Sequence, residues 1–236
     1  MIIGAGILGV ALLLSVFVAG KYAYNIRAFD NGLSVTGSAQ TNVTADSVKW
    51  TSSIQRVVTE TALKTGYAQM SKDAKIVSDF FKKQGIADEN VTVSTVFADQ
   101  IYKYDANNNG PREYTLRQTF TISSTGVEKV SALAKNIQGI VDQGVVFSAS
   151  APEYYYSKLA SLRVSLLGDA IKDAKARAEQ LANSSGQKVG ALKSASSGVV
   201  QVLAPNSIDV SDYGQYDTQS INKTVMVTAR ATFILQ

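Results

Sequence analysis

LSVTGSAQTNVTADSVKWTSSIQRVVTE, residues 33–60, is the stretch that sets the fold class of this chain. Its first part is rich in β-branched residues, and its second part alternates apolar and polar side chains through Val48, Trp50 and Ile54. Both patterns are typical of strands. The stretch therefore predicts two consecutive strands, which we expect to form the first hairpin of a sheet.

Three later stretches show the spacing of three and four residues that predicts amphipathic helices. The first covers 63–81 and is closed by Gly85 as a C-cap. The second, 127–138, follows a capping box formed by Thr125 and Glu128. The third and longest runs over about 158–183. Its predicted buried stripe consists of Leu159, Leu162, Leu166, Ala170, Ala174, Ala178 and Leu181.

The remaining apolar segments predict strands that come mostly in pairs. Those at 91–104 and 112–124 flank a tip of Asn, Gly and Pro residues, which is typical of an antiparallel hairpin. Further strands are expected at 145–157, 190–205 and 223–236, with a polar loop or hairpin tip before the last. Paired strands with few helices between them indicate an α+β fold with a largely antiparallel sheet, its long helices packed on one face.

The first twenty residues, MIIGAGILGVALLLSVFVAG, fit two incompatible patterns. Gly4, Gly6 and Gly9, with Asp30 about twenty residues on, match the dinucleotide-binding fingerprint. However, 2–20 is uncharged and apolar all round, as a membrane-spanning helix needs. Because no series of strand and helix repeats follows, we favour the membrane span.

The predicted organisation is an uncleaved transmembrane anchor over 1–24, a linker over 25–32 and a folded domain over 33–236. Lys21 and Arg27 follow the span, but long domains are exported largely regardless of flanking charge. We therefore expect a single-pass protein of the bacterial inner membrane with its domain in the periplasm. Small residues four apart are candidate contacts between anchors, namely Ala5, Gly9, Ala11, Ser15 and Ala19.

Composition narrows the chemistry. The chain has no cysteine and no histidine, which removes disulfides, thiolate chemistry, the usual general base and the usual zinc ligand. Its net charge of +4 is dispersed, so nucleic acid is not an expected partner. Asp169 and Asp173 share one helix face, but Lys172 and Arg177 lie alongside and favour a solvated salt-bridge face. We expect no catalysis, no cofactor and no metal.

Six tyrosines gather around the predicted hairpin and the strand that follows it. Cross-strand aromatic packing is the first interpretation, and a binding interface is the second, since tyrosine is enriched at interfaces. The candidate interface residues are Tyr102, Tyr104, Tyr114, Tyr154, Tyr155 and Tyr156.

Several strings resemble the SIMPL-domain family of bacterial periplasmic and outer-surface proteins: 33–50 at the first hairpin, 91–104 with 112–123, 145–150, and 165–198. The resemblance implies a Gly-Ser turn in the first strand, at Gly37 and Ser38, and self-association into a large ring- or cage-like homo-oligomer. It supplies no catalytic residues. Two functions follow as hypotheses: an anchored, self-assembling envelope protein with a structural or stress-protective role, or a periplasmic binding module for a small ligand or protein partner.

Overall fold

The structure is a computed structural model of the chain, and it describes residues 13–21, 32–102, 110–207 and 211–236. The first sheet has four strands, β1 (Gly32–Thr44), β8 (Val189–Leu203), β9 (Gln215–Tyr216) and β10 (Asn222–Leu235). The second sheet contains β2 (Ser47–Thr59), β3 (Val91–Val93), β4 (Phe97–Ile101), β5 (Glu113–Ser124), β6 (Phe147–Ala149) and β7 (Glu153–Tyr155). Besides the helical stretch 13–21, the described helices are α2 (Leu63–Lys83), α3 (Val127–Lys135), α4 (Gln138–Val141) and α5 (Leu159–Ser184), with short 3-10 turns η1 (Glu60–Ala62) and η2 (Asp88–Asn90).

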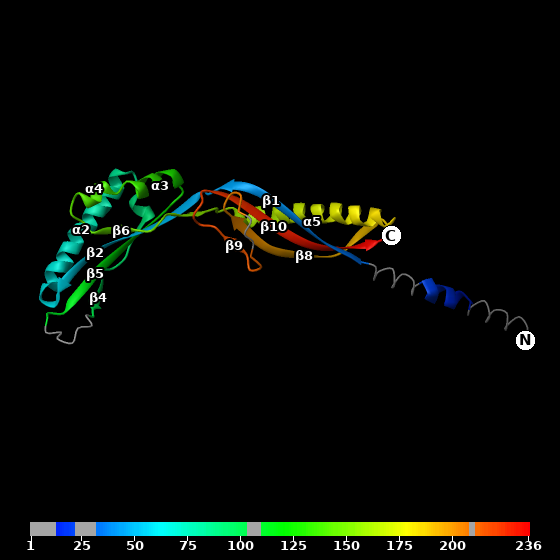
Figure 1. The fold of residues 1–236 in the computed structure, drawn as a ribbon, viewed down its shortest axis with the longest axis horizontal. Coiled ribbons are helices and arrows are strands. Elements are labelled where there is room, and N and C mark those ends of the chain that lie inside the picture. The colour runs from blue at the N-terminus through cyan, green and yellow to red at the C-terminus, as the bar shows by residue number, and fades with distance from the viewer. Residues whose placement is uncertain (1–12, 22–31, 103–109, 208–210) are drawn as a thin grey trace, which may run out of the picture.

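The two sheets follow one another along the long axis of the molecule (Figure 1). The order of the four-stranded sheet is β1-β10-β8-β9, and that of the other is β3-β5-β2-β6 with β4 on β5 and β7 on β2. Among the described strands, only β8 and β9 pair in parallel. The predicted α+β class and antiparallel pairing are confirmed, but two sheets replace the single expected one. Each carries its helices on one face: α2, α3 and α4 on the second sheet and α5 on the first.

The predicted first hairpin is wrong. In the described chain β1 pairs with β10, whereas β2 pairs with β5, β6 and β7. Ala45 and Asp46 carry the chain straight from one sheet into the other. Ala45 N–H donates to the Ile221 carbonyl at 2.8 Å, and Asp46 N–H donates to the Tyr155 carbonyl at 3.0 Å. Neither residue supplies the positive φ that a tight hairpin turn favours. The alternating pattern identified both strands correctly but not their partners.

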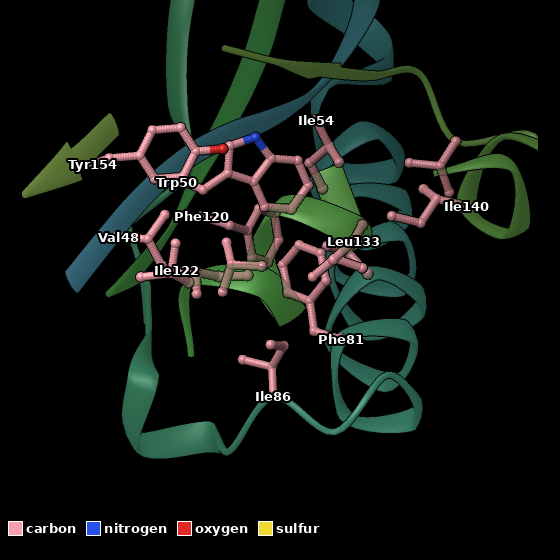
Figure 2. Packing of buried hydrophobic residues seen from close by; sticks show 14 of the residues in the cluster. Val48, Trp50, Ile54, Phe81, Ile86, Phe120, Ile122, Leu133, Ile140 and Tyr154 are labelled. Atoms are coloured by element: carbon pink, nitrogen blue, oxygen red, sulfur yellow. The ribbon is translucent and has the colours of Figure 1, made fainter. Parts of the chain in front are cut away.

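An aromatic cluster forms the core of the second sheet (Figure 2). The Phe81 ring, from α2, lies 5.9 Å from that of Trp50 and 6.1 Å from that of Phe120, centroid to centroid. The Trp50 indole N–H donates to the Ser150 carbonyl at 2.9 Å, so this buried polar group is satisfied. Val48 and Ile54 are buried on the same face, as the alternation predicts.

The helix α5 lies unusually close to β1. Its buried stripe consists of Leu166 and alanines, and it ends at Ala182, since the predicted Leu181 is 53% exposed. Where the helix crosses β1, a Cβ on Gly37 would overlap the backbone of Ala170 and Ala174. The implied turn at Gly37 and Ser38 is therefore absent, because both residues belong to a continuous strand. Glycine is needed there for close backbone approach instead.

Other local predictions hold with adjusted ends. The structure confirms α2, with Gly85 at a φ of +76° just beyond it, and the hairpin of β4 with β5. The helix α3 forms without the predicted capping box, since its N-cap is Gly126 and no side chain caps it. The predicted strand 145–157 is split into β6 and β7, with Pro152 between them.

The predicted anchor lies mostly beyond the described residues, which begin at 13 and omit 22–31. Residues 13–21 are helical and exposed, and they include the candidate contacts Ser15 and Ala19, whereas Ala5, Gly9 and Ala11 fall outside. None of the helices in the described ranges has the length and apolar character that a membrane span needs.

We expect Gly37→Ala to lower the free energy of unfolding by about 1–3 kcal/mol or more, because the new methyl group must push α5 off β1. The matched control is Gly168→Ala on α5, where an added Cβ meets nothing within 4 Å. That change should stabilise the protein by up to about 1 kcal/mol through helix propensity. Urea unfolding of both variants measures the difference, and equal stabilities would contradict the close approach.

Candidate functional site

The predicted tyrosine cluster is divided between the two ends of the second sheet. Tyr114 pairs with Val58 of β2, and the 85% exposed Tyr102 directly follows β4 near it. Tyr154 pairs with Val48, at the other end of β2 and about 33 Å away for a strand rise of about 3.3 Å per residue. Tyr104 lies outside the described residues. The six residues therefore form no single patch, and their role at an interface stays a prediction.

Two of these tyrosines have structural roles that the sequence did not indicate. Tyr154 is only 8% exposed, and its hydroxyl lies 2.9 Å from Ser131 Oγ. Because Ser131 Oγ donates to the Val127 carbonyl, the tyrosine hydroxyl is the donor in this pair and ties β7 to α3. The Tyr155 ring packs against that of Tyr216 with centroids 5.9 Å apart. Tyr154 is thus core, and Tyr155 joins the segment that precedes β10.

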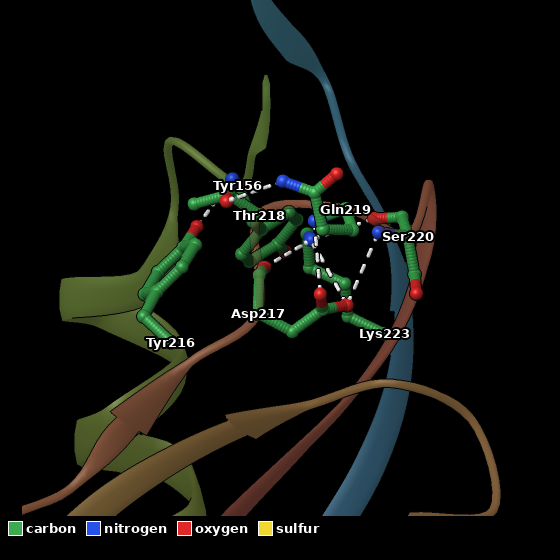
Figure 3. A network of polar contacts seen from close by, with 7 residues as sticks. All are labelled: Tyr156, Tyr216, Asp217, Thr218, Gln219, Ser220 and Lys223. Carbon is green, nitrogen blue, oxygen red and sulfur yellow. Dashed lines mark hydrogen bonds and ion pairs between the residues drawn. The ribbon is translucent and has the colours of Figure 1, made fainter. Parts of the chain in front are cut away.

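A buried lysine holds the junction between the sheets (Figure 3). Lys223 is 1% exposed, and its Nζ donates to the carbonyls of Asp217 and Ser220, the latter at 2.6 Å. The Asp217 carboxylate lies 3.7 Å away, and the Tyr216 ring centroid lies 5.7 Å away. Burial lowers the pKa of Lys223, against the opposing effect of Asp217. A desolvated ammonium persists only where carbonyls and a carboxylate replace its water shell.

The segment that Lys223 holds also contacts the second sheet. Tyr154 N–H donates to the Thr218 carbonyl at 2.8 Å, and Tyr156 N–H donates to the Tyr216 hydroxyl at 2.8 Å. Gln219 and Ser220 donate their N–H groups to the Asp217 carboxylate, which fixes the turn itself. The lysine therefore orders a segment that ties β7 to β10. One signal in the sequence could have shown it, since Lys223 occupies the buried phase of β10 that Val225 and Val227 continue.

The two long edges of the first sheet are treated differently. On the β1 edge, Ser38 N–H donates to Asp173 Oδ2 of α5 at 2.8 Å, and Arg177 holds the same oxygen at 2.8 Å. On the β8 edge, β9 pairs only with Gln201 and Val202, and no described strand pairs with 189–200 on that side. The β1 edge also has no further described strand, but an α5 side chain occupies its N–H at Ser38, so the β8 edge is the better place for strand addition.

The pairing register identifies the groups on the open edge. Ser38 of β1 pairs with Thr228 of β10, and Ser38 N–H points away from β10 toward Asp173. Opposite residues in an antiparallel pair both point inward or both point outward, so Thr228 directs its backbone groups toward β8. Arg230, two residues further along β10, does so as well. Arg230 pairs with Ser196. The neighbouring residues Ala195 and Ser197 therefore direct their N–H and C=O groups outward, where the carbonyls of a further strand can accept from the N–H groups and its N–H groups can donate to the carbonyls.

The carboxylates singled out in the sequence lie on a salt-bridge face, as predicted. Asp169 pairs with Lys172 at 2.8 Å, and Asp173 pairs with Arg177. Within the described ranges, no group of three or more acidic residues is placed to hold a metal ion.

Two cavities stand out among those on the described surface. One of about 440 Å³ lies between β2 and the start of α2, beside Arg56, whose guanidinium is held by buried Asp73. The larger, of about 740 Å³, lies at the β8 edge between Gln201 and Tyr213. Both are open hollows with mixed polar and apolar linings.

These features define an α+β protein with an open sheet edge and a buried, polar junction. The model of the SIMPL family, described as a protein of unknown function (DUF541), matches residues 33–233. The chain belongs to this family. No curated protein matches it.

Two solved structures show distant likeness. An amidase of the hydantoinase/carbamoylase family from Burkholderia phymatum is 13% identical over 56% of this chain, with a TM-score of 0.26, and the match covers 35% of the amidase. The regulatory subunit of aspartate kinase from Thermus flavus is 12% identical, with 83% of this chain and 89% of that one covered and a TM-score of 0.19. The chain thus spans about a third of the amidase's length, and neither structure is close enough to inform function.

Lys223→Met replaces the unbranched apolar stem of the lysine and removes its ammonium group. We expect it to lower the free energy of unfolding by about 3 kcal/mol, because it leaves buried carbonyls and Asp217 without their cation. Lys172→Met on the exposed face of α5 is the control and should change little. Chemical denaturation measures both, and an unchanged Lys223→Met protein would show that the ammonium contributes nothing net.

Low pH should weaken two contacts, that of Asp46 at the junction between the sheets and that of Asp173 between α5 and β1. Burial raises the pKa of Asp46, but two hydrogen bonds from Ser157 outweigh burial and bring the pKa below its ordinary value of 3.8. The Ser38 hydrogen bond, followed by Arg177, lowers the pKa of Asp173. Groups with depressed pKa values contribute stability above their unfolded-state pKa and lose it as the pH falls through the folded-state pKa.

We therefore expect the free energy of unfolding to fall below about pH 4. The double variant Asp46→Asn with Asp173→Asn should be less stable at neutral pH and should show a flatter acid limb. Denaturation midpoints measured between about pH 7 and about pH 2 test this. Parallel acid limbs in the two proteins would contradict the assignment.

Proposed function

We propose that this protein is a membrane-anchored, self-assembling envelope protein with a structural or stress-protective role and no catalysis, located in the bacterial inner membrane with its domain in the periplasm. The observation that carries the proposal is the open β8 edge, where residues 189–200 of a 15-residue strand pair with β10 on one side and with no described strand on the other. An edge of this length is a template for pairing with another chain.

A second copy of the chain fits this edge best. Residues 194–200, SASSGVV, are uncharged and mostly small, so two identical strands can approach without like charges facing each other. If a two-fold axis passes through Ser196, the outward-directed Ala195 pairs with Ser197 of the partner strand, and Lys193 faces Val199 and not the other lysine. Antiparallel pairing then joins two four-stranded sheets into one. Such a pair is the unit from which a ring- or cage-like assembly is built through further contacts.

The anchoring part of the proposal is supported by the N-terminal sequence. Residues 2–20 carry no charge, and the described helical stretch 13–21 exposes Leu13, Val16 and Phe17. Exposed apolar side chains in such a density favour lipid over water.

A binding module remains the second candidate, and the cavity of about 740 Å³ beside the β8 edge favours it. Ligand sites are concave and carry a few convergent polar groups. The cavity and the strand edge share residues 197–200, so assembly and binding are separated by variants outside the shared residues, at Ala195 for assembly and at Arg163 for binding.

Ala195→Pro tests assembly, since it removes an N–H that the register directs outward without taking a hydrogen bond from β10. We expect full-length protein in detergent to form oligomers by mass photometry, and Ala195→Pro to shift at least half of the particles to monomers. Ala195→Val keeps the N–H and should assemble like wild type. Monomers in the wild type, or unchanged oligomers in the proline variant with intact circular dichroism, would refute pairing through β8.

A further inference from the structure

Gln201, which lines the cavity at the β8 edge, carries a buried hydrogen-bond acceptor that no described residue satisfies. The Gln201 side chain is 4% exposed, and its Nε2 donates to the Ser211 carbonyl. Because a carbonyl can only accept, this bond fixes the orientation of the amide. Gln201 Oε1 is buried and receives no donor from any described residue. A buried acceptor without a donor is costly, and a ligand N–H that reaches Oε1 through a small shift of the cavity wall would remove that cost.

The same cavity carries one positive and one negative group, and neither is neutralised. Arg163 of α5 and Asp212 both line it, and neither forms an ion pair with the other or with another described residue. Elsewhere on the described surface, α5 pairs its charges readily, as Asp169 does with Lys172 and Asp173 with Arg177. Two unpaired opposite charges at one hollow are suited to a ligand that carries both.

The rest of the lining combines the hydroxyl residues Ser197, Ser211 and Thr228 with apolar and aromatic side chains. Met226 and Val199 form part of the wall, and Tyr213, which is 97% exposed, offers an open ring at the rim. A ligand therefore meets an acceptor, a guanidinium, a carboxylate and an apolar surface within about 740 Å³.

From this combination we infer that the cavity binds a zwitterionic α-amino acid or short peptide with an apolar side chain. The ammonium group donates to Gln201 Oε1 and pairs with Asp212. The carboxylate accepts from the Arg163 guanidinium, which suits planar anions. The side chain packs on Met226, Val199 and the Tyr213 ring. The cavity shares residues 197–200 with the β8 edge, whereas Ala195 lies outside its lining, so Ala195→Pro monomers keep the site.

Calorimetric titration of the full-length protein in detergent with the dipeptide L-alanyl-L-leucine tests the inference. We expect a dissociation constant between about 10 µM and about 1 mM. The N-acetylated and C-amidated forms of the same dipeptide, each lacking one charge, should bind at least about tenfold more weakly. Absence of binding to wild type and to the Ala195→Pro monomer alike, or equal binding of the capped forms, would overturn the inference.

Variants assign each charge to its partner. Arg163→Gln should weaken binding of the free dipeptide about tenfold but leave binding of the C-amidated form unaffected. Asp212→Asn should likewise weaken binding of the free dipeptide about tenfold but leave binding of the N-acetylated form unaffected. Gln201→Met, which removes the buried acceptor, should weaken every form that keeps its ammonium group. Lys172→Gln, on α5 but outside the cavity, is the control and should bind like wild type. Equal losses for free and capped dipeptides would overturn the assigned contacts.

Discussion

The passage of the chain between two sheets at Ala45 and Asp46 is the constraint on which the rest of the structure depends. Two strands that run directly into one another cannot pair with each other, so each needs partners from far along the chain. Both N–H groups of the passage are used, by Ile221 and by Tyr155, and the Asp46 carboxylate accepts from Ser157 just before α5. The segment before β10 closes over this point through Lys223. A junction this short is rigid only because buried polar groups on both sides are satisfied.

The unequal protection of the first sheet follows from where α5 lies. Glycine at position 37 lets the helix backbone approach β1, and that approach places Asp173 within reach of the edge N–H of Ser38. The helix cannot cover both edges of the sheet, so β8 remains open beyond Gln201. The same open edge offers a strand for assembly and, where the 211–213 segment folds over it, the wall of a cavity. Both proposed activities of the molecule thus depend on the position of α5 on the first sheet.

Local patterns predicted the elements far better than their partners. The helices α2 and α5 and the strands β2, β5, β8 and β10 were predictable because periodicity reports which face of an element is buried. The hairpin of β1 with β2 was not, since alternation says nothing about which strand lies alongside. The sequence placed the tyrosines around one hairpin and the strand that follows it, but in the structure they lie at opposite ends of β2. The role of Lys223 was missed although the residue falls among the buried positions of β10. A charged residue at such a position is explained only by the groups that pair with it, and the sequence does not show these.

By itself, the sequence determined the α+β class, the antiparallel pairing, the long alanine-rich helix, the family and the absence of cysteine and histidine chemistry. These properties depend on composition and on short-range periodicity, which the chain carries before it folds. Only the tertiary structure decided that there are two sheets, that β1 is protected and β8 is open, and that Lys223 is buried. It also placed Arg163, Asp212 and Gln201 around one cavity. Each of these depends on groups far apart in the chain meeting in space, and no local pattern encodes that meeting.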